Sequence, residues 1–166
     1  MAHGVVRTDK MFGTENKAGL ASFRYQPNGD NTAIDNGNVV LLGDLETGSR
    51  EVYKGGTPAA NSALKDVVLV AAPEVAYDER IRNLDEFYNE AGKIVRGYHF
   101  HTNDIFSVTK DALEGKATPE VGDVVELKAG TKLNVAASAT GGSTVVGKII
   151  DINVVGRYTY YAIKVA

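Results

Sequence analysis

Two histidines at alternate positions, His99 and His101, are the residues whose spacing most suggests chemistry. Alternate residues of a strand project from one face, and imidazole is a common metal ligand. Asp104 follows nearby, and His3 supplies a third imidazole near the N-terminus. A metal site needs more ligands than this spacing signals, and paired histidines on strands are usually exposed or hydrogen-bonded. We therefore expect no metal site.

Carboxylates and serines give no catalytic pattern either. The acidic residues are scattered, whereas a glycosidase needs two of them held roughly 5 to 10 Å apart across a cleft. Ser107 and Ser138 lack the G-x-S-x-G motif and an adjacent base. The stretch ATGGST, residues 139–144, lacks the lysine and the following helix of a phosphate-binding loop, and we expect a turn there. We therefore expect no catalytic residues, no cofactor and no enzymatic activity.

The charge of the chain argues against a nucleic-acid partner. The net charge is −3 and the pI is about 5.6, so the electrostatic attraction that dominates non-specific nucleic-acid binding is missing. Four basic residues near the aromatic residues Tyr98 and Phe100 could form a stacking patch, but acidic neighbours largely neutralise them. These basic residues are Arg80, Arg82, Lys93 and Arg96.

Other features of the composition bound the fold and the compartment. A chain of 166 residues, 43% of them hydrophobic, can bury one sizeable core. The absence of cysteine removes disulfides, thiolate catalysis and cysteine-ligated zinc. No apolar run resembles a signal peptide or approaches the roughly 20 residues that span a bilayer. We expect synthesis in a cytoplasm and no membrane partner.

Short β-type segments separated by turns predict a mainly β fold, a small β-barrel or sandwich of about eight strands. Many glycines and few prolines fit such a fold, because tight turns need residues that adopt positive φ. The expected strands lie within residues 39–42, 50–53, 67–71, 94–101, 105–109, 118–137, 145–154 and 158–165.

The sequence DERIRNLDEFYNEAGK, residues 78–93, is the one helical candidate. Its apolar residues recur at helical spacing on one flank, at Ile81, Leu84 and Tyr88. Asp78 and Glu79 favour the N-terminal end of a helix, because a carboxylate there interacts well with the helix dipole. We expect one short helix, stabilised by docking on the sheet.

Residues 1–38 are rich in Gly, Asn, Asp and Thr, with isolated apolar residues that fit neither a helix nor a regular strand. This pattern favours an extended N-terminal arm that needs a surface to lie on, followed by a β-rich body over residues 39–166. An irregular terminus packed on its own domain is an equally weighted alternative.

The chain closes with the tyrosine-rich stretch GRYTYYAIKVA, residues 156–166. Alternation places Tyr158 and Tyr160 on one face, and Tyr161, Ile163 and Val165 on a face that looks like core. The first two tyrosines either complete the sheet and hydrogen-bond locally or meet another protein. Burial statistics favour the first interpretation.

Several longer stretches carry a resemblance to a known class of protein. They are AIDNGNVVLLGDLETGSREVY (33–53), LVAAPEVAYDE (69–79), LDEFYNEAGKIVRGY (84–98), DIFSVTKDALEGKATPEVGDVVELKAGTKLNV (104–135) and VVGKIIDINVVGRYTYYAIKVA (145–166). In their style and order they resemble small auxiliary head proteins of tailed bacteriophages, the capsid decoration and head-fibre-base class. The resemblance covers most of the chain from Ala33 onward.

The resemblance implies a structural virion protein that binds the outer surface of the assembled phage capsid and stabilises the lattice of major capsid protein. Its partners would be the major capsid protein and further copies of itself, and its location the exterior of the virion. An arm that orders on docking would concentrate its anchors in the apolar residues. The expected partner-binding residues are Met11, Phe12, Phe23, Tyr25, Tyr158 and Tyr160.

Two alternatives of other classes accompany this expectation. The first is a carbohydrate- or ligand-binding β module at a host-contact position, because tyrosine-lined β faces serve that role too. The second, ranked last, is a hydrolase with carboxylate chemistry.

Overall fold

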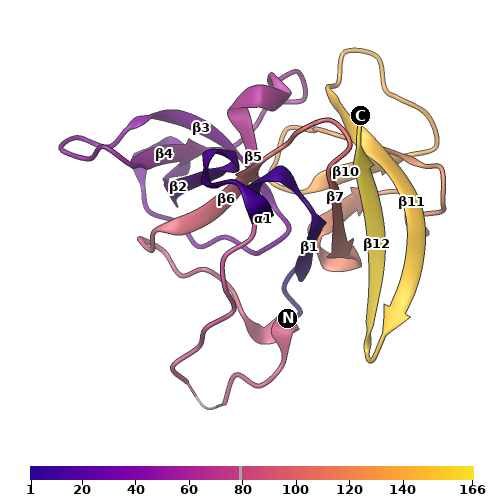
Figure 1. The fold of residues 1–166 in the computed structure, drawn as a ribbon, viewed down its shortest axis with the longest axis horizontal. Coiled ribbons are helices and arrows are strands. Elements are labelled where there is room, and N and C mark those ends of the chain that lie inside the picture. The colour runs from indigo at the N-terminus through magenta and orange to yellow at the C-terminus, as the bar shows by residue number, and fades with distance from the viewer. Residues whose placement is uncertain (79) are drawn as a thin grey trace.

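The computed structural model describes residues 1–78 and 80–166, and its fold is mainly β (Figure 1). Five strands form a closed barrel in the order β2-β4-β3-β5-β6, and seven form a sheet in the order β1-β7-β12-β11-β9-β10-β8. This confirms the expected class, a mainly β fold with a small barrel. The described residues form twelve strands rather than about eight, because several of them are only three to five residues long.

The barrel strands are β2 (Leu20–Tyr25), β3 (Val39–Leu45), β4 (Val52–Gly56), β5 (Val67–Val70) and β6 (Val95–His99). The strands of the seven-stranded sheet are β1 (Val6–Lys10), β7 (Ile105–Thr109), β8 (Leu113–Gly115), β9 (Val124–Glu126), β10 (Leu133–Ala136), β11 (Val145–Val155) and β12 (Tyr158–Val165). The helical elements are α1 (Phe12–Glu15) and the 3-10 turns η1 (Lys17–Gly19), η2 (Pro27–Gly29), η3 (Leu64–Asp66), η4 (Leu84–Glu86) and η5 (Lys110–Ala112).

The barrel is built around Phe23, whose side chain is fully buried. Two glycines on neighbouring strands make room for its ring. A Cβ on Gly55 would lie 2.8 Å from Phe23 Cδ2, and a Cβ on Gly97 would lie 2.6 Å from Val68 Cγ2. The small barrel therefore needs glycine at both positions, because its interior holds the rings of Phe23 and Tyr25 together with branched side chains at close-packed density.

A second core joins the barrel to the seven-stranded sheet. Barrel residues such as Val39 and Leu69 pack in one cluster with Phe106 and Ile163 of the sheet. β5 is buried on both faces, as its continuous apolar run VVLV predicts, because one face fills the barrel and the other meets the sheet.

The chain begins in the sheet, builds the barrel and then returns to the sheet. β1 pairs antiparallel with β7, with Val6 opposite Val108. The backbone N–H of Val5 also donates to Thr109 Oγ1 at 3.0 Å, across 104 positions of sequence. The whole barrel is thus inserted between two strands that lie side by side.

The expected N-terminal arm over residues 1–38 is wrong. β1 is an edge strand of the sheet, and β2 pairs with both β4 and β6 in the barrel. The expected boundary between residues 38 and 39 falls just before β3 of that same barrel. The arm interpretation missed the strand β2, LASFRY. Its residues alternate between buried and half-buried, but Ala21 and Ser22 weaken the apolar pattern in the sequence.

The expected helix over residues 78–93 is also wrong. Among the described residues of that segment only η4, Leu84–Glu86, is helical, and the backbone at Phe87 is extended. The side chain of Glu86 accepts from the N–H of Asn83 and closes this single turn. Leu84 and Tyr88 are 40% and 39% exposed, so the expected apolar flank is not buried as that of a docked helix would be. Glu79, expected to favour the helix start, lies outside the described residues.

The α-helix that does form is α1, Phe12–Glu15, inside the segment expected to be an arm.

Other expectations are confirmed. β3 and β4 form the antiparallel pair expected after residue 38, and β9 and β10 form the hairpin expected within residues 118–137. The stretch 139–144 is a turn, in which Gly142 has a φ of +87°.

Candidate functional site

The long connection from β5 to β6, residues 71–94, is called the strap here. Its one regular element among the described residues is η4. Connections longer than about 15 residues without their own secondary structure are uncommon in compact domains and usually serve a function. Figure 1 shows the strap hanging from the body at the end opposite to the C-terminus. The strap is therefore the first candidate for a binding surface.

The buried side chain of Asn36 fixes both ends of the strap. Its Nδ2 donates to the carbonyl of Ala72 at 2.9 Å, and its Oδ1 accepts from the N–H of Ala72 at 3.0 Å. The same Oδ1 accepts from Nδ2 of Asn89 at 3.1 Å. Asn89 also forms an isolated antiparallel bridge with Ile34. The strap is thus held at its base by the loop before β3.

A projecting hairpin lies beside the strap. The pairing of β11 with β9 ends at Lys148, and the pairing of β12 with β7 begins only at Tyr160. The tip of the β11–β12 pair, residues 154–159, therefore has no third strand within the described part of the chain. Figure 1 shows this hairpin extending toward the same end of the molecule as the strap.

Asp85 ties the middle of the strap to the tip of the hairpin. Its Oδ1 accepts from the hydroxyl of Tyr158 at 3.1 Å, and its Oδ2 lies 3.0 Å from Nη2 of Arg157. The Tyr158 hydroxyl in turn accepts from the N–H of Leu84 at 3.1 Å. The guanidinium of Arg157 lies 5.5 Å from the centre of the Tyr158 ring. These contacts hold the strap in one position against the hairpin.

The N-terminus adds a further contact. The backbone N–H of His3 donates to the carbonyl of Asp85 at 2.8 Å, and its ring stacks on Tyr88 with centroids 4.9 Å apart. Nδ1 of His3 lies 2.7 Å from Oδ1 of Asp35. His3 therefore bridges the strap and the loop that carries Asn36.

Exposed apolar side chains gather on the strap and the hairpin tip. Tyr77 is 97% exposed, Val75 is 64% exposed and Val155 is 51% exposed. Val155 lies opposite Tyr158, whose hydroxyl bonds to Leu84, so the hairpin and strap parts are continuous. We call this set the strap–hairpin surface, which consists of Val75, Tyr77, Leu84, Tyr88, Val155 and Tyr158. Clusters of exposed apolar residues mark interaction sites on soluble proteins.

The strap also carries the net charge of the protein. It has six acidic and three basic residues, an excess of three negative charges, and the whole chain has a net charge of −3. The rest of the chain is therefore balanced. Charge concentrated in one projecting segment steers the approach of an oppositely charged partner.

Local contacts keep two of these carboxylates ionised. A hydrogen bond from Arg80 to Asp78, at 2.7 Å, lowers the pKa of Asp78 and raises that of Arg80. Hydrogen bonds from the N–H groups of Asn83 and Arg82 lower the pKa of Glu86. Asp78 and Glu86 therefore stay ionised at neutral pH.

The two best-formed pockets are small. One, of about 180 Å³, lies within the strap and is lined by Glu74, Ala76, Ile81, Arg82, Asn83, Leu84 and Phe87. The other, also about 180 Å³, lies beside β1 and is lined by Val6, Thr8, Ala71, Ala72, Pro73, Glu74, Arg96 and Tyr98. Both are smaller than the roughly 300 to 1,000 Å³ that is usual for sites that bind drug-sized ligands.

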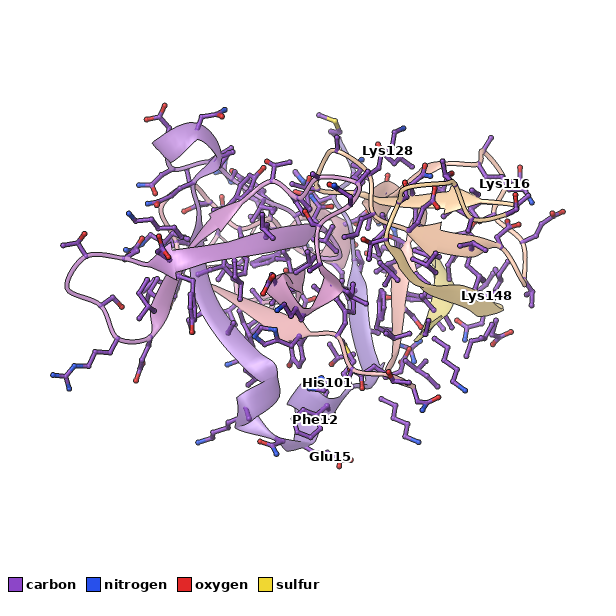
Figure 2. The ribbon with its side chains drawn as sticks, turned by 90° about the horizontal axis from the view of Figure 1, so that it is seen from above. Phe12, Glu15, His101, Lys116, Lys128 and Lys148 are labelled. Atoms are coloured by element: carbon purple, nitrogen blue, oxygen red, sulfur yellow. The ribbon has the colours of Figure 1, made fainter. Side chains whose placement is uncertain are left out.

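Only one of the two histidines that suggested chemistry lies in a strand. β6 ends at His99, where burial lowers the pKa of the imidazole. His101 lies beyond the strand, where its ring contacts that of Phe12 in a tilted arrangement with centroids 4.4 Å apart, and its Nδ1 is 3.8 Å from Oδ2 of Asp104 (Figure 2). Within residues 1–78 and 80–166, no three His, Cys, Asp or Glu side chains are grouped to hold a metal ion.

Four of the six expected partner-binding residues lie inside the protein. Phe23 is fully buried, and Met11, Tyr25 and Tyr160 are 2%, 8% and 4% exposed. Their burial leaves them little surface for a partner, because Phe23 and Tyr25 lie on the inward face of β2, Tyr160 lies in β12, and Met11 is buried between β1 and α1. Phe12 keeps 40% of its surface exposed.

Tyr158 and Tyr160 follow the favoured interpretation of the last strand, which completes the sheet. Tyr160 is covered by the guanidinium of Arg7, 5.0 Å from its ring centre, and burial raises the pKa of its hydroxyl. Tyr158 hydrogen-bonds within its own chain but belongs to the strap–hairpin surface. Tyr98 and Phe100, considered for base stacking, are each 8% exposed and present no stacking platform.

The residues that matter most for the site carried little sequence signal. Asn36, Asp85 and His3 act through contacts between distant positions, which no local pattern encodes. Tyr77 could have been found, because an aromatic residue follows Pro73 in a stretch with no periodicity.

No helix among the described residues has the length and apolar character to cross a membrane. Comparison of the chain with protein-family models, with curated proteins and with solved structures gave no match.

Proposed function

We propose that the protein is a structural component of a tailed-phage particle that binds the outer surface of the assembled capsid and stabilises the lattice of major capsid protein. In this role it catalyses no reaction. The sequence support is the resemblance to auxiliary head proteins over residues 33–166. The structural observation that carries the proposal is the strap–hairpin surface, which we take as the protein-binding surface of the chain.

The composition of this surface supports binding to a protein. Tyrosine is enriched at protein interfaces, because its ring buries apolar area while its hydroxyl remains solvated or hydrogen-bonded. Three of the six residues of the surface are tyrosines, at positions 77, 88 and 158.

The anchoring of the surface supports tight recognition. A binding loop that is already ordered loses less conformational entropy on association than a free one. Asn36 holds the base of the strap, and Asp85 holds its middle against the hairpin. Many such contacts on one lattice add up, since neighbouring sites raise the effective concentration.

Cosedimentation with capsids tests the proposal. The purified chain is mixed with assembled capsids of the phage that encodes it, prepared without the chain, and with unassembled major capsid protein. We expect saturable pelleting at a fixed ratio with the capsids and no complex with the free subunits. Decorated capsids should also release their contents at a higher temperature than bare ones.

Two other results would replace the proposal. A chain that ignores capsids but binds one glycan selectively on an array is a carbohydrate-binding module. A chain that hydrolyses a model glycoside, with activity abolished by a single carboxylate substitution, is an enzyme.

A further inference from the structure

Three exposed lysines form a row across one face of the seven-stranded sheet. Lys10 lies opposite Ile105, Ile105 lies opposite Lys164, and Lys164 lies opposite Lys148. Residues directly opposite one another in neighbouring strands project from the same face. We call these four residues the lysine row. It runs across β1, β7, β12 and β11.

The lysine row has no acidic partner within the described part of the chain. Lys116 and Lys128 form ion pairs there, whereas Lys10, Lys148 and Lys164 form none. Like charges directly opposite each other on a sheet are destabilising, and Lys148 and Lys164 are such a pair. The folded monomer gains nothing from this arrangement, so an acidic partner is its simplest explanation.

The lysine row and the strap lie at opposite ends of the molecule. Figure 1 shows the end of β12 and the start of β11 beside the C-terminus, and the strap at the other end. Figure 2 places Lys148 on the side of the seven-stranded sheet, away from α1. Each chain therefore presents an acidic end and a basic end.

The two ends also match in their apolar parts. On the strap, the exposed residues Val75 and Tyr77 are flanked by the carboxylates of Glu74 and Asp78. A tyrosine ring can accept a lysine ammonium over its face, and lysine stems cover apolar surface.

On the lysine row the flanking charges are positive. A half-exposed apolar residue, Ile105, lies between the ammonium groups of Lys10 and Lys164. The strap therefore has apolar residues between two acidic residues, and the lysine row has an apolar residue between two lysines.

We propose that the strap–hairpin surface of one copy docks on the lysine row of a second copy, so that copies join head to tail. The inference rests on the proposed function in one respect, that the strap–hairpin surface binds protein. The two surfaces differ, so the contact is heterologous and builds rings or chains. A small charged contact of this kind is weak in free solution.

Sedimentation velocity of the purified full-length chain tests the inference. Concentrations from about 10 μM to about 1 mM cover the range expected of a weak contact. In about 20 mM salt we expect the weight-average sedimentation coefficient to rise with concentration, and in about 300 mM salt we expect it to stay at the monomer value, because salt screens exposed charges. A chain that stays monomeric throughout at low salt overturns the inference.

Charge reversal with a matched control separates the lysine row from net charge. The double variant Lys148→Glu, Lys164→Glu should remain monomeric. The double variant Lys54→Glu, Lys65→Glu makes the same change in net charge at exposed positions outside the row, and it should associate like the parent. Equal loss of association in both would mean that net charge, not the row, controls association.

The strap side has its own pair of variants. Tyr77→Ala should weaken association several-fold, whereas Leu45→Ala, at an exposed apolar residue of the distant β3, should not. Circular dichroism checks that each variant is folded. Carbodiimide cross-linking of isotopically mixed copies should join strap carboxylates to Lys10, Lys148 or Lys164, and intermolecular links elsewhere would contradict the geometry.

The two proposals fail separately. A parent chain that pellets with capsids but never self-associates overturns the head-to-tail contact alone. A parent chain that self-associates through the lysine row but ignores capsids overturns the proposed function alone.

Discussion

The hydroxyl of Tyr158 donates to Oδ1 of Asp85 at 3.1 Å, although the two residues are 73 positions apart. This contact joins the last strand of the sheet to a loop of the barrel. It holds the strap, which has little regular structure, against a hairpin that is rigid by its own pairing. The pair therefore controls how well ordered the candidate binding surface is before a partner arrives.

Tyr158→Phe removes this contact and the acceptor for the N–H of Leu84. We expect a loss of about 1 kcal/mol in the free energy of unfolding, typical of a hydrogen bond. Trypsin cleavage at the exposed Arg80 should rise several-fold, because the strap is freed from the hairpin. Tyr161→Phe is the matched control, since the Tyr161 hydroxyl has no hydrogen-bond partner among the described residues. Equal cleavage rates in both variants would contradict the anchoring role.

The N-terminal segment is required for folding. A chain lacking residues 1–38 loses β1, β2 and the ring of Phe23, and we expect it to lack a cooperative unfolding transition in urea. Phe23→Ala in the full chain should cost about 3 to 5 kcal/mol, as truncation of buried aromatic residues does. Phe12→Ala, at a half-exposed ring that contacts the ring of His101, should cost about 1 kcal/mol. A stable, folded 39–166 fragment would show that the N-terminal strands are dispensable.

Glu126 gives stability that depends on pH. Its burial opposes ionisation, but hydrogen bonds from Thr140 and from Nδ2 of Asn134 outweigh burial and lower the pKa of the carboxyl. The folded state thus holds this proton less tightly than the unfolded chain. The contribution is present above the unfolded pKa of about 4.3 and is lost as pH falls through the lower folded value.

Glu126→Gln should therefore destabilise the protein at pH 7 and progressively less as the pH falls towards about 3. Urea unfolding at several pH values measures this difference. Glu51→Gln, at an exposed site, serves as the comparison and should change little. A Glu126→Gln deficit that is independent of pH would mean that shape, not charge, is what this site requires.

Relief of the lysine pair should stabilise the monomer. Lys164→Gln removes a positive charge directly opposite Lys148, and we expect a gain of about 0.2 to 1 kcal/mol, the usual size of a cross-strand pair effect. The gain should shrink in high salt. Lys54→Gln should leave the melting temperature unchanged. A loss of stability in Lys164→Gln would indicate that the lysine makes a favourable contact within the monomer.

Much of the fold could be predicted because several strands have a clear pattern of apolar residues in their own sequence. The run VVLV of β5 is apolar on both faces, and the strand is buried on both faces. β11 and β12 were expected within two residues of their observed limits. In each case the burial of the strand determines which of its consecutive residues are apolar, so a short stretch of sequence is enough to recognise it.

The failures have a common physical cause, which is that distant contacts decide the outcome. β1, VRTDK, is an edge strand with one buried residue, so its sequence resembles a loop. The segment 78–93 has helical spacing, but the strap is fixed by Asn36 and Tyr158 from outside it, and its apolar residues stay exposed. The candidate site combines the strap, the hairpin and the N-terminus, and no local pattern reports that combination.

The insertion of the barrel between β1 and β7 has a consequence for synthesis. β1 is made first, yet its partner leaves the ribosome only after about a hundred further residues, since Val5 and Thr109 are 104 positions apart. All five barrel strands are made between these two strands, so β1 is without its partner throughout their synthesis. The pairing of β1 in the sheet can therefore form only after the barrel residues have left the ribosome, however early this strand is available.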